Sequence, residues 1–190
     1  LLAAALVLGV LSAGVANAGI PDPNGDVLEP DDVGIWKMDL ETGESELIFS
    51  VAQAAAVENP FNDTTGLKHY FNHLLVNPAG TRFIVLHRYR PKFDPQSLRF
   101  EGGFITRMFT ANVDGSDRYI LDPSGYTSHF IWKDDDESTM WTRPAGKKSG
   151  FYIFKDKTRE FRPIGQDKMP TNGHNTYLPA PYGDWILNDT

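Results

Sequence analysis

One two-stranded unit occurs three times along the chain, and this repetition constrains the fold more than any other feature. Each copy opens on a histidine with an apolar or aromatic residue three positions later, passes through a turn rich in Pro, Gly or Asp, and ends in a second strand-like segment. The copies are His73–Leu86, His129–Trp141 and His174–Leu187. Their histidines are 56 (129 − 73) and 45 (174 − 129) residues apart. Such spacing indicates an array of similar structural units.

A second type of hairpin alternates with the first. Its copies are Ile35–Gly43, Met108–Gly115 and Phe151–Thr158, each a strand-like segment that reaches an acidic or Gly-containing turn. Two hairpins per repeat predict four-stranded units, and propeller blades repeat at about 40–50 residues. An insertion over Pro91–Gly103 explains the longer first interval. A β-sandwich would not repeat the same histidine-led hairpin. The sequence therefore predicts an all-β fold, a β-propeller fragment of about three four-stranded antiparallel blades over residues 34–190, truncated at both ends.

The first 18 residues differ from the rest of the chain. They are almost entirely apolar and end in Ala16-Asn17-Ala18, a pattern that signal peptidase accepts. Without an initiator Met or a basic region, this segment is an incomplete signal peptide, and we expect cleavage after Ala18. A buried helix is the alternative. Residues 19–33 are rich in Pro and Asp and form a linker. The sequence therefore predicts a periplasmic or secreted protein that does not associate with a membrane after cleavage.

Charge and composition exclude several classes of function. The formal net charge is −7 and no long basic segment is present, so the sequence predicts no nucleic-acid partner. The chain has no cysteine, which excludes disulfides, thiolate metal ligands and a cysteine nucleophile. Any metal ion must therefore be bound by His, Asp, Glu, Asn or Gln side chains.

In a propeller, the chain entering each innermost strand lies on the same face as the loop between the second and third strands. We expect three histidines where the chain enters an innermost strand: His73, His129 and His174. The expected loops between second and third strands are His87–Lys92 and Arg143–Lys148. Imidazoles suit a divalent metal, and Arg suits carboxylates. Alternatively, a repeated histidine can bond the backbone of the neighbouring blade, and a basic loop can be a solvated turn.

These residues also carry a resemblance to a known family. The run Asn72–Phe83 followed by His87-Arg88 resembles blades of the oligogalacturonate lyases, as do Ser128-His129 with Trp132 and Gly173-His174 with Trp185–Leu187. The resemblance covers most of residues 34–190. The pattern of the turns is shared with Tol-type periplasmic propellers, so only the histidines make the resemblance specific.

The resemblance implies β-elimination of α-1,4-linked galacturonate at the mouth of the channel, with a histidine-rich manganese centre and a histidine base. It implies His73 as the base and His129 and His174 as ligands of a divalent metal such as manganese. Where the family has a second His and a Gln near the last histidine, this chain has Asn172, Asn175 and Thr176.

The chemistry of this reaction requires a base for the C5 proton and positive charge beside the C6 carboxylate. The predicted binding residues for an acidic oligosaccharide are His87, Arg88, Tyr89, Arg90 and Arg143, with the arginines binding carboxylates and Tyr89 packing against a sugar face. A non-catalytic propeller of the cell envelope, binding a protein or a saccharide on the same face, is the alternative. In either case the remaining blades of the same chain are an expected partner.

Overall fold

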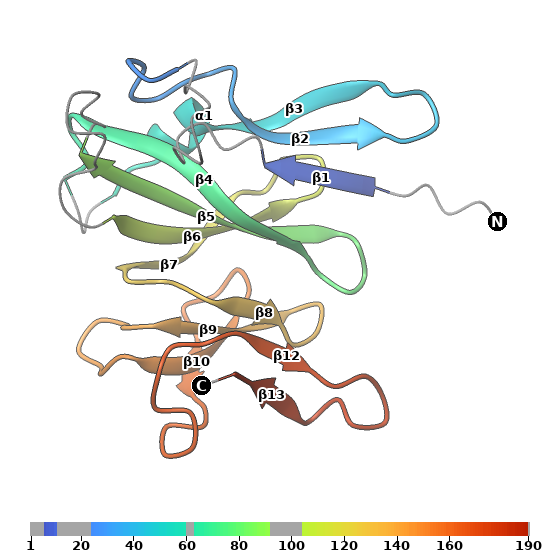
Figure 1. Cartoon of the computed structure of the whole chain (residues 1–190), viewed down its shortest axis with the longest axis vertical. Helices are drawn as coiled ribbons and strands as arrows, with labels where there is room; N and C mark the ends of the chain where they lie inside the picture. Colours follow the sequence, from blue (N-terminus) through green and yellow to red (C-terminus); the bar gives the residue numbers. More distant parts are fainter. Residues whose placement is uncertain (1–5, 11–23, 60–62, 92–103, 190) are drawn as a thin grey trace.

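The protein is described here by a computed structural model, which covers residues 6–10, 24–59, 63–91 and 104–189. Its strands form four antiparallel sheets, which we number along the chain (Figure 1). The first sheet contains β1 (Leu6–Val10), β2 (Gly34–Asp39) and β3 (Ser45–Ser50), and the second contains β4 (Leu67–Val76), β5 (Arg82–Pro91), β6 (Ile105–Asn112) and β7 (Tyr119–Gly125). The third contains β8 (Phe130–Trp132), β9 (Glu137–Thr142), β10 (Gly150–Lys155) and β11 (Phe161–Pro163), and the fourth contains β12 (Asn175–Tyr177) and β13 (Ile186–Asn188).

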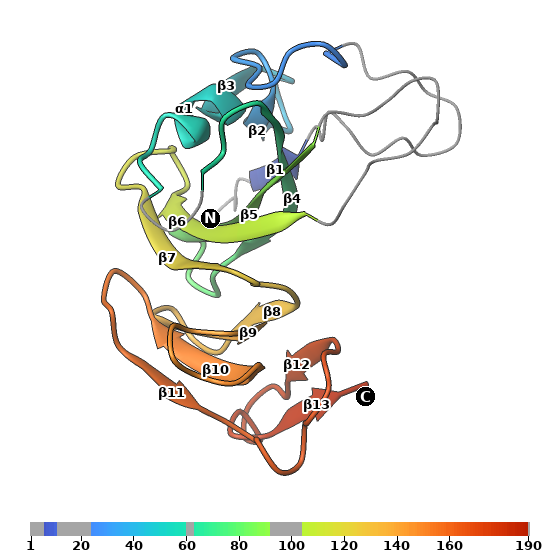
Figure 2. The ribbon, with the colours of Figure 1, turned by 90° about the vertical axis from the view of Figure 1, so that its left-hand side faces the viewer.

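The all-β prediction is confirmed, and the predicted hairpins are found. The histidine-led copies correspond to β4–β5, β8–β9 and β12–β13, and the other copies correspond to β2–β3, β6–β7 and β10–β11. The described residues contain two four-stranded sheets, flanked by sheets of three and two strands. Figure 2 shows the four sheets following one another along a curve, with β4, β8 and β12 on the same side. This arrangement is compatible with propeller blades, although the described strands do not close a ring.

The apolar segment at the beginning of the chain contributes a strand. Residues Leu6–Val10 form β1, which pairs antiparallel with β2, so this part of the segment is not the buried helix of the alternative interpretation. Ala18 and most of the insertion at Pro91–Gly103 lie outside the described residues. Export and cleavage therefore stay predictions. Among the residues that the structure covers, no helix is long and apolar enough to cross a membrane.

The second sheet is buried on both faces, and β5 shows why its sequence is an unbroken apolar run. Side chains alternate between the two faces of a strand. Phe83 and Val85 join a core cluster with β2, β3 and the short helix α1 (Val51–Ala55), whereas Ile84 and Leu86 join a second cluster with the third sheet. All four β5 side chains are fully buried. Face-to-face packing of sheets therefore provides the core.

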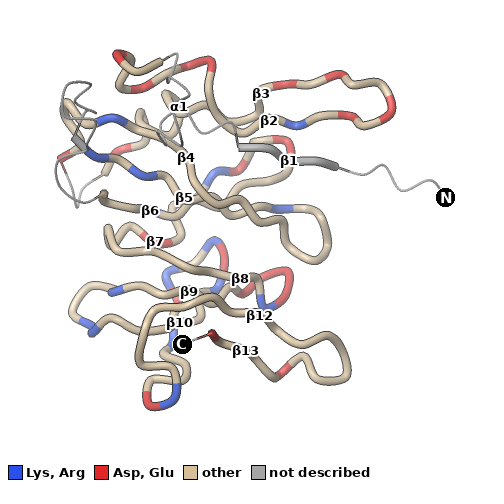
Figure 3. The backbone as a smooth tube through the Cα atoms, viewed as in Figure 1, with Lys and Arg blue, Asp and Glu red and all other residues tan. Residues whose placement is uncertain are grey.

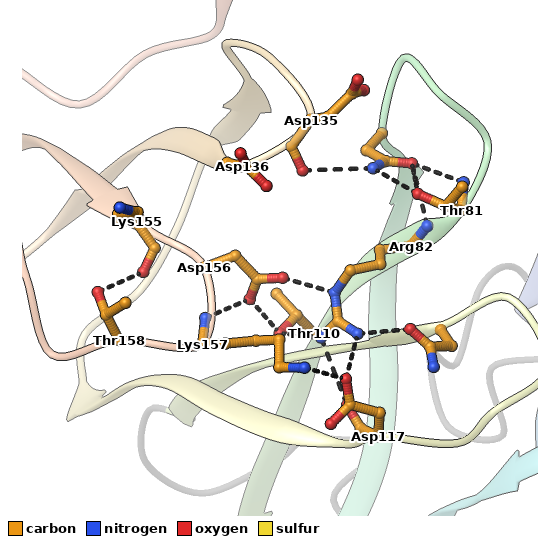
Figure 4. A network of polar contacts seen from close by, with 12 residues as sticks. Thr81, Arg82, Thr110, Asp117, Asp135, Asp136, Lys155, Asp156, Lys157 and Thr158 are labelled. Atoms are coloured by element: carbon orange, nitrogen blue, oxygen red, sulfur yellow. Dashed lines mark hydrogen bonds and ion pairs between the residues drawn. The ribbon is translucent and has the colours of Figure 1, made fainter.

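Polar contacts also join the second sheet to the third (Figure 4). Arg82 Nε donates to Asp156 Oδ2 at 2.5 Å, and Thr110 Oγ1 donates to the other oxygen of the same carboxylate at 2.6 Å. The Arg82 guanidinium also contacts Asn112 and Asp117. Because Arg82 and Asp156 are both largely buried, this ion pair holds the two sheets in a defined orientation.

Candidate functional site

Three histidines from three successive sheets line one pocket. His73 lies in β4, His129 immediately precedes β8, and His174 immediately precedes β12. The pocket has a volume of about 270 Å³, and the apolar residues around the rings include Leu74 and Phe130. The ring centroids of His129 and His174 are 4.2 Å apart. The structure thus brings together the three histidines that occupy equivalent positions in the repeats.

A β-bulge presents His73 to the pocket. In the pairing of β4 with β5, Asn72 is opposite Leu86 and Leu74 is opposite Val85, so His73 has no partner residue. Its φ of 51° lies in the left-handed region, which is uncommon for residues other than Gly, although Asn, Asp and His adopt it more often than the rest. Bulges of this kind redirect a side chain out of the regular alternation and are frequent next to functional sites. His73 is accordingly exposed in a strand whose other residues are buried or half-buried.

His129 is oriented by an amide. Its Nδ1 lies 2.9 Å from Asn172 Oδ1, and the Nδ2 of the same amide donates to Ser128 Oγ. The second contact places the amide oxygen toward the imidazole, so Nδ1 of His129 donates the proton. Nε2 is then the nitrogen that can accept a proton or bind a ligand.

His174 is oriented by a carboxylate. Its Nδ1 donates to Asp189 Oδ2 at 2.9 Å, and its backbone N–H donates to Asp189 Oδ1 at 2.7 Å. These two hydrogen bonds lower the pKa of Asp189. An imidazole held at Nδ1 by a carboxylate again leaves Nε2 for chemistry, an arrangement found in metal sites and in catalytic triads.

The pKa of His73 is lowered below its ordinary value. Partial desolvation is the main cause, and the positive charges of Arg88, His129 and His174 add to it. Arg88 is mostly buried, hydrogen-bonds Tyr70, and lies with its guanidinium 4.2 Å from the centroid of the Phe104 ring. His73 is therefore neutral near pH 7 and can accept a proton, in a region where Arg88 supplies positive potential.

None of the five residues predicted to bind substrate lines the histidine pocket, and two of them are fully buried in the second sheet. The sequence predicts that this strand ends at Leu86, but β5 continues to Pro91 and pairs with β4 and β6. His87 and Tyr89 are therefore in the interior of a strand, and both are fully buried. Tyr89 Oη accepts a hydrogen bond from Asn59 Nδ2 at 2.7 Å. Neither side chain reaches the surface in this structure, and the prediction that they bind a saccharide stays untested.

His87 belongs instead to a second, enclosed histidine group. Arg107 Nε donates to His87 Nδ1 at 3.0 Å, so the proton of a neutral His87 is on Nε2, which faces His69 Nδ1 at 3.0 Å. The Nε2 of His69 then carries its proton and faces Glu29 at 3.7 Å. Burial lowers the pKa of His87 far below its ordinary value and also lowers the pKa of His69. Both histidines are neutral near pH 7.

The other two predicted arginines also have aromatic neighbours. Arg90 lies with its guanidinium 4.9 Å from the centroid of Tyr70, at the same end of β5 as Arg88. Arg143 lies 3.5 Å from the centroid of Tyr126 and lines a different pocket from the three histidines. Figure 3 shows Lys and Arg on the left-hand side of the view, on β5 and on the loop between β9 and β10.

The histidine pocket contains two side chains of the kind that bind metal ions. His129 and His174 offer two imidazole nitrogens, and the hydrogen bonds at their Nδ1 atoms are of the kind that orients metal ligands. In the parts of the chain covered by the structure, however, no three His, Asp or Glu side chains are arranged around a common point. Two imidazoles do not complete the coordination of Mn²⁺, so the described residues do not fit a full site.

Sequence reasoning missed the partners of the histidines. Asp189 is 15 residues from His174, and Asn172 is 43 residues from His129. Neither spacing is a known motif, although Asn172 stands where the resembling family differs from this chain. Comparison with known proteins finds no matching family model, curated protein or solved structure. Any functional proposal therefore has to rest on the geometry of the described residues.

Proposed function

We propose that this chain is part of an exported propeller-type protein that binds acidic oligosaccharides at the histidine pocket and cleaves them by β-elimination. One observation carries the proposal: the histidines that lead the three sequence repeats line one pocket, and two of them are held at Nδ1 by side-chain acceptors. Histidines with a structural role would instead hydrogen-bond the backbone or other buried side chains through their ring nitrogens, as His69 and His87 do in the enclosed group.

In the proposed reaction, Nε2 or Nδ1 of neutral His73 removes the C5 proton of a uronate. The electrons of that bond form the C4–C5 double bond, and the C4–O bond breaks. The departing sugar oxygen takes a proton from solvent. Positive charge near the C6 carboxylate stabilises the enolate-like transition state, and Arg88 is the cation electrostatically coupled to His73. His129 and His174 would bind the substrate or contribute two ligands to a divalent cation.

The test is formation of unsaturated product from α-1,4-linked galacturonate oligomers, followed by ultraviolet absorbance, with and without added Mn²⁺. We expect His73→Ala to lower kcat at least about 100-fold, because a general base contributes that much. Lys37→Gln, a change in a partly exposed ion pair between β2 and β3, is the control and should leave the rate unchanged. Unsaturated product formed equally by both variants would refute the role of His73.

The metal and export parts of the proposal have separate tests. His129→Ala and His174→Ala should each reduce bound Mn²⁺, measured by elemental analysis, whereas His73→Ala should not. Equal metal content in all three variants would remove the metal from the proposal. Mass spectrometry of the exported protein should find Gly19 at its amino terminus, and an intact leading segment in that fraction would contradict cleavage.

A non-catalytic binding protein is the second candidate. It is favoured by the exposed aromatic side chains of Tyr182 and Trp185 between β12 and β13, which are 60% and 68% exposed. Exposed aromatic residues of this kind are typical of surfaces that bind another molecule. Saccharide binding without any unsaturated product, in wild type and with Mn²⁺ present, would favour this candidate over the lyase.

A further inference from the structure

A second pocket of about 520 Å³ lies between the second and third sheets. The end of β7 and the following residues form one side, and the loop between β9 and β10 together with β11 forms the other. Its volume is within the range of small-molecule binding sites, about 300–1,000 Å³. The pocket shares no lining residue with the histidine pocket.

Three positively charged side chains line this second pocket, and none of them has an ion-pair partner among the residues covered by the structure. They are Arg143, Lys147 and Arg159, and all three are exposed. The carboxylate among the lining residues, Asp122, is 1% exposed and already accepts hydrogen bonds from Ser124, Thr127 and Thr142. The charge that the pocket offers to a ligand is therefore positive.

Aromatic faces complete the second pocket. Tyr126 is 54% exposed, and the Arg143 guanidinium lies 3.5 Å from the centroid of its ring. Phe161 is 38% exposed and stacks on Phe154 with a centroid distance of 5.2 Å. Stacking holds the plane of the Arg143 guanidinium while its N–H donors stay available for a carboxylate. A sugar ring can pack its C–H face on an aromatic ring, whereas an inorganic anion would gain nothing from it.

The two pockets are close together. Tyr126 of the second pocket and His129 of the histidine pocket are three residues apart, so their Cα atoms are separated by at most about 11 Å. We propose that the second pocket is an additional subsite, in which Arg143, Lys147 and Arg159 bind uronate units of the same saccharide chain whose reacting bond lies at the histidines. This inference rests on the proposed function, and it adds that tight binding requires a saccharide long enough to reach both pockets.

The test measures the affinity of galacturonate dimers and hexamers by calorimetry. For the wild-type protein we expect the hexamer to bind at least about tenfold more tightly, the contribution of one additional charge-assisted contact. Arg143→Gln and Tyr126→Ala should each reduce this ratio toward one while leaving the affinity for the dimer unchanged. Lys148→Gln is the matched control, because Lys148 is exposed in the same loop and does not line the pocket.

Different outcomes separate the two proposals. Equal affinity of the wild-type protein for dimer and hexamer would overturn the subsite and leave the proposed function standing. The same ratio of hexamer to dimer affinity in Arg143→Gln and Lys148→Gln would do so as well. A parallel loss of dimer affinity in Arg143→Gln would place Arg143 in the first site and would also overturn a separate subsite. Failure of every uronide to bind the wild-type protein would overturn the proposed function and this inference together.

Discussion

The five histidines form two groups that differ in almost every physical respect, although one strand contributes to both. In the enclosed group, His69 and His87 are fully buried, and Arg107 and their own rings occupy three of the four ring nitrogens. In the pocket group, each ring that has a side-chain partner is held at one nitrogen only. His69 and His73 are four residues apart on β4. Residue type therefore does not determine the role; burial and unused bonding capacity do.

The enclosed group should matter most for stability. Arg107 is 1% exposed, and it also donates to the backbone carbonyls of Ala54 and Val57 at the end of α1. Arg107→Leu would leave these acceptors and His87 Nδ1 buried without a donor, so we expect the free energy of unfolding to fall by about 3–5 kcal/mol. Denaturant titration measures this change.

Arg143→Leu is the control for that comparison, because Arg143 is exposed and has no ion-pair partner in the described structure. Its effect should stay within about 0.5 kcal/mol. A loss below about 1 kcal/mol for Arg107→Leu would mean that the enclosed group is not a structural element, and the contrast between the two histidine groups would not hold.

The enclosed group should also make stability depend on pH. The pKa values of His87 and His69 are lowered in the folded protein, whereas both return to about 6.5 on unfolding. Below pH 6.5 the unfolded chain therefore binds more protons, and stability falls by up to about 1.4 kcal/mol per pH unit for each group. This stabilisation is fully present above pH 6.5.

Denaturation midpoints between pH 7 and pH 5 test this dependence. In His87→Gln the decrease should be smaller, since one titrating group is removed. The same slope in wild type and His87→Gln would show that the enclosed imidazole is not responsible. The carboxyl of Glu137, whose pKa is lowered to about 2 by Arg162 and Lys133, contributes only below this range.

The smallest stability effect is expected in the pocket. His73→Asn keeps a residue that tolerates a φ of 51°, and the side chain is exposed, so the free energy of unfolding should change by no more than about 0.5 kcal/mol. Thermal melting checks this, and the unsaturated product should be absent. A large loss of stability would show that His73 is structural, and the two groups would then differ less than we infer.

The sequence predicted the hairpins and their order well, because alternation and turn residues are local signals that repeat. It placed His87 and Tyr89 in a loop because a run of His, Arg and Tyr is polar, although both faces of β5 are covered by neighbouring sheets. It contained no signal for Arg107, whose partners are on α1 and β5, or for Asp189 beside His174. These contacts depend on how the sheets stack, which no local pattern encodes.

The bulge at His73 has a consequence for how this site can arise and be lost. The imidazole belongs to an extra residue in β4. The parts of β4 before and after His73 are therefore out of register with each other by one position. Removing that single codon would bring Asn72 and Leu74 into continuous register with Leu86 and Val85. A deletion could thus erase the side chain and restore a regular ladder in one step. The site is therefore sensitive to changes in chain length as well as to substitution.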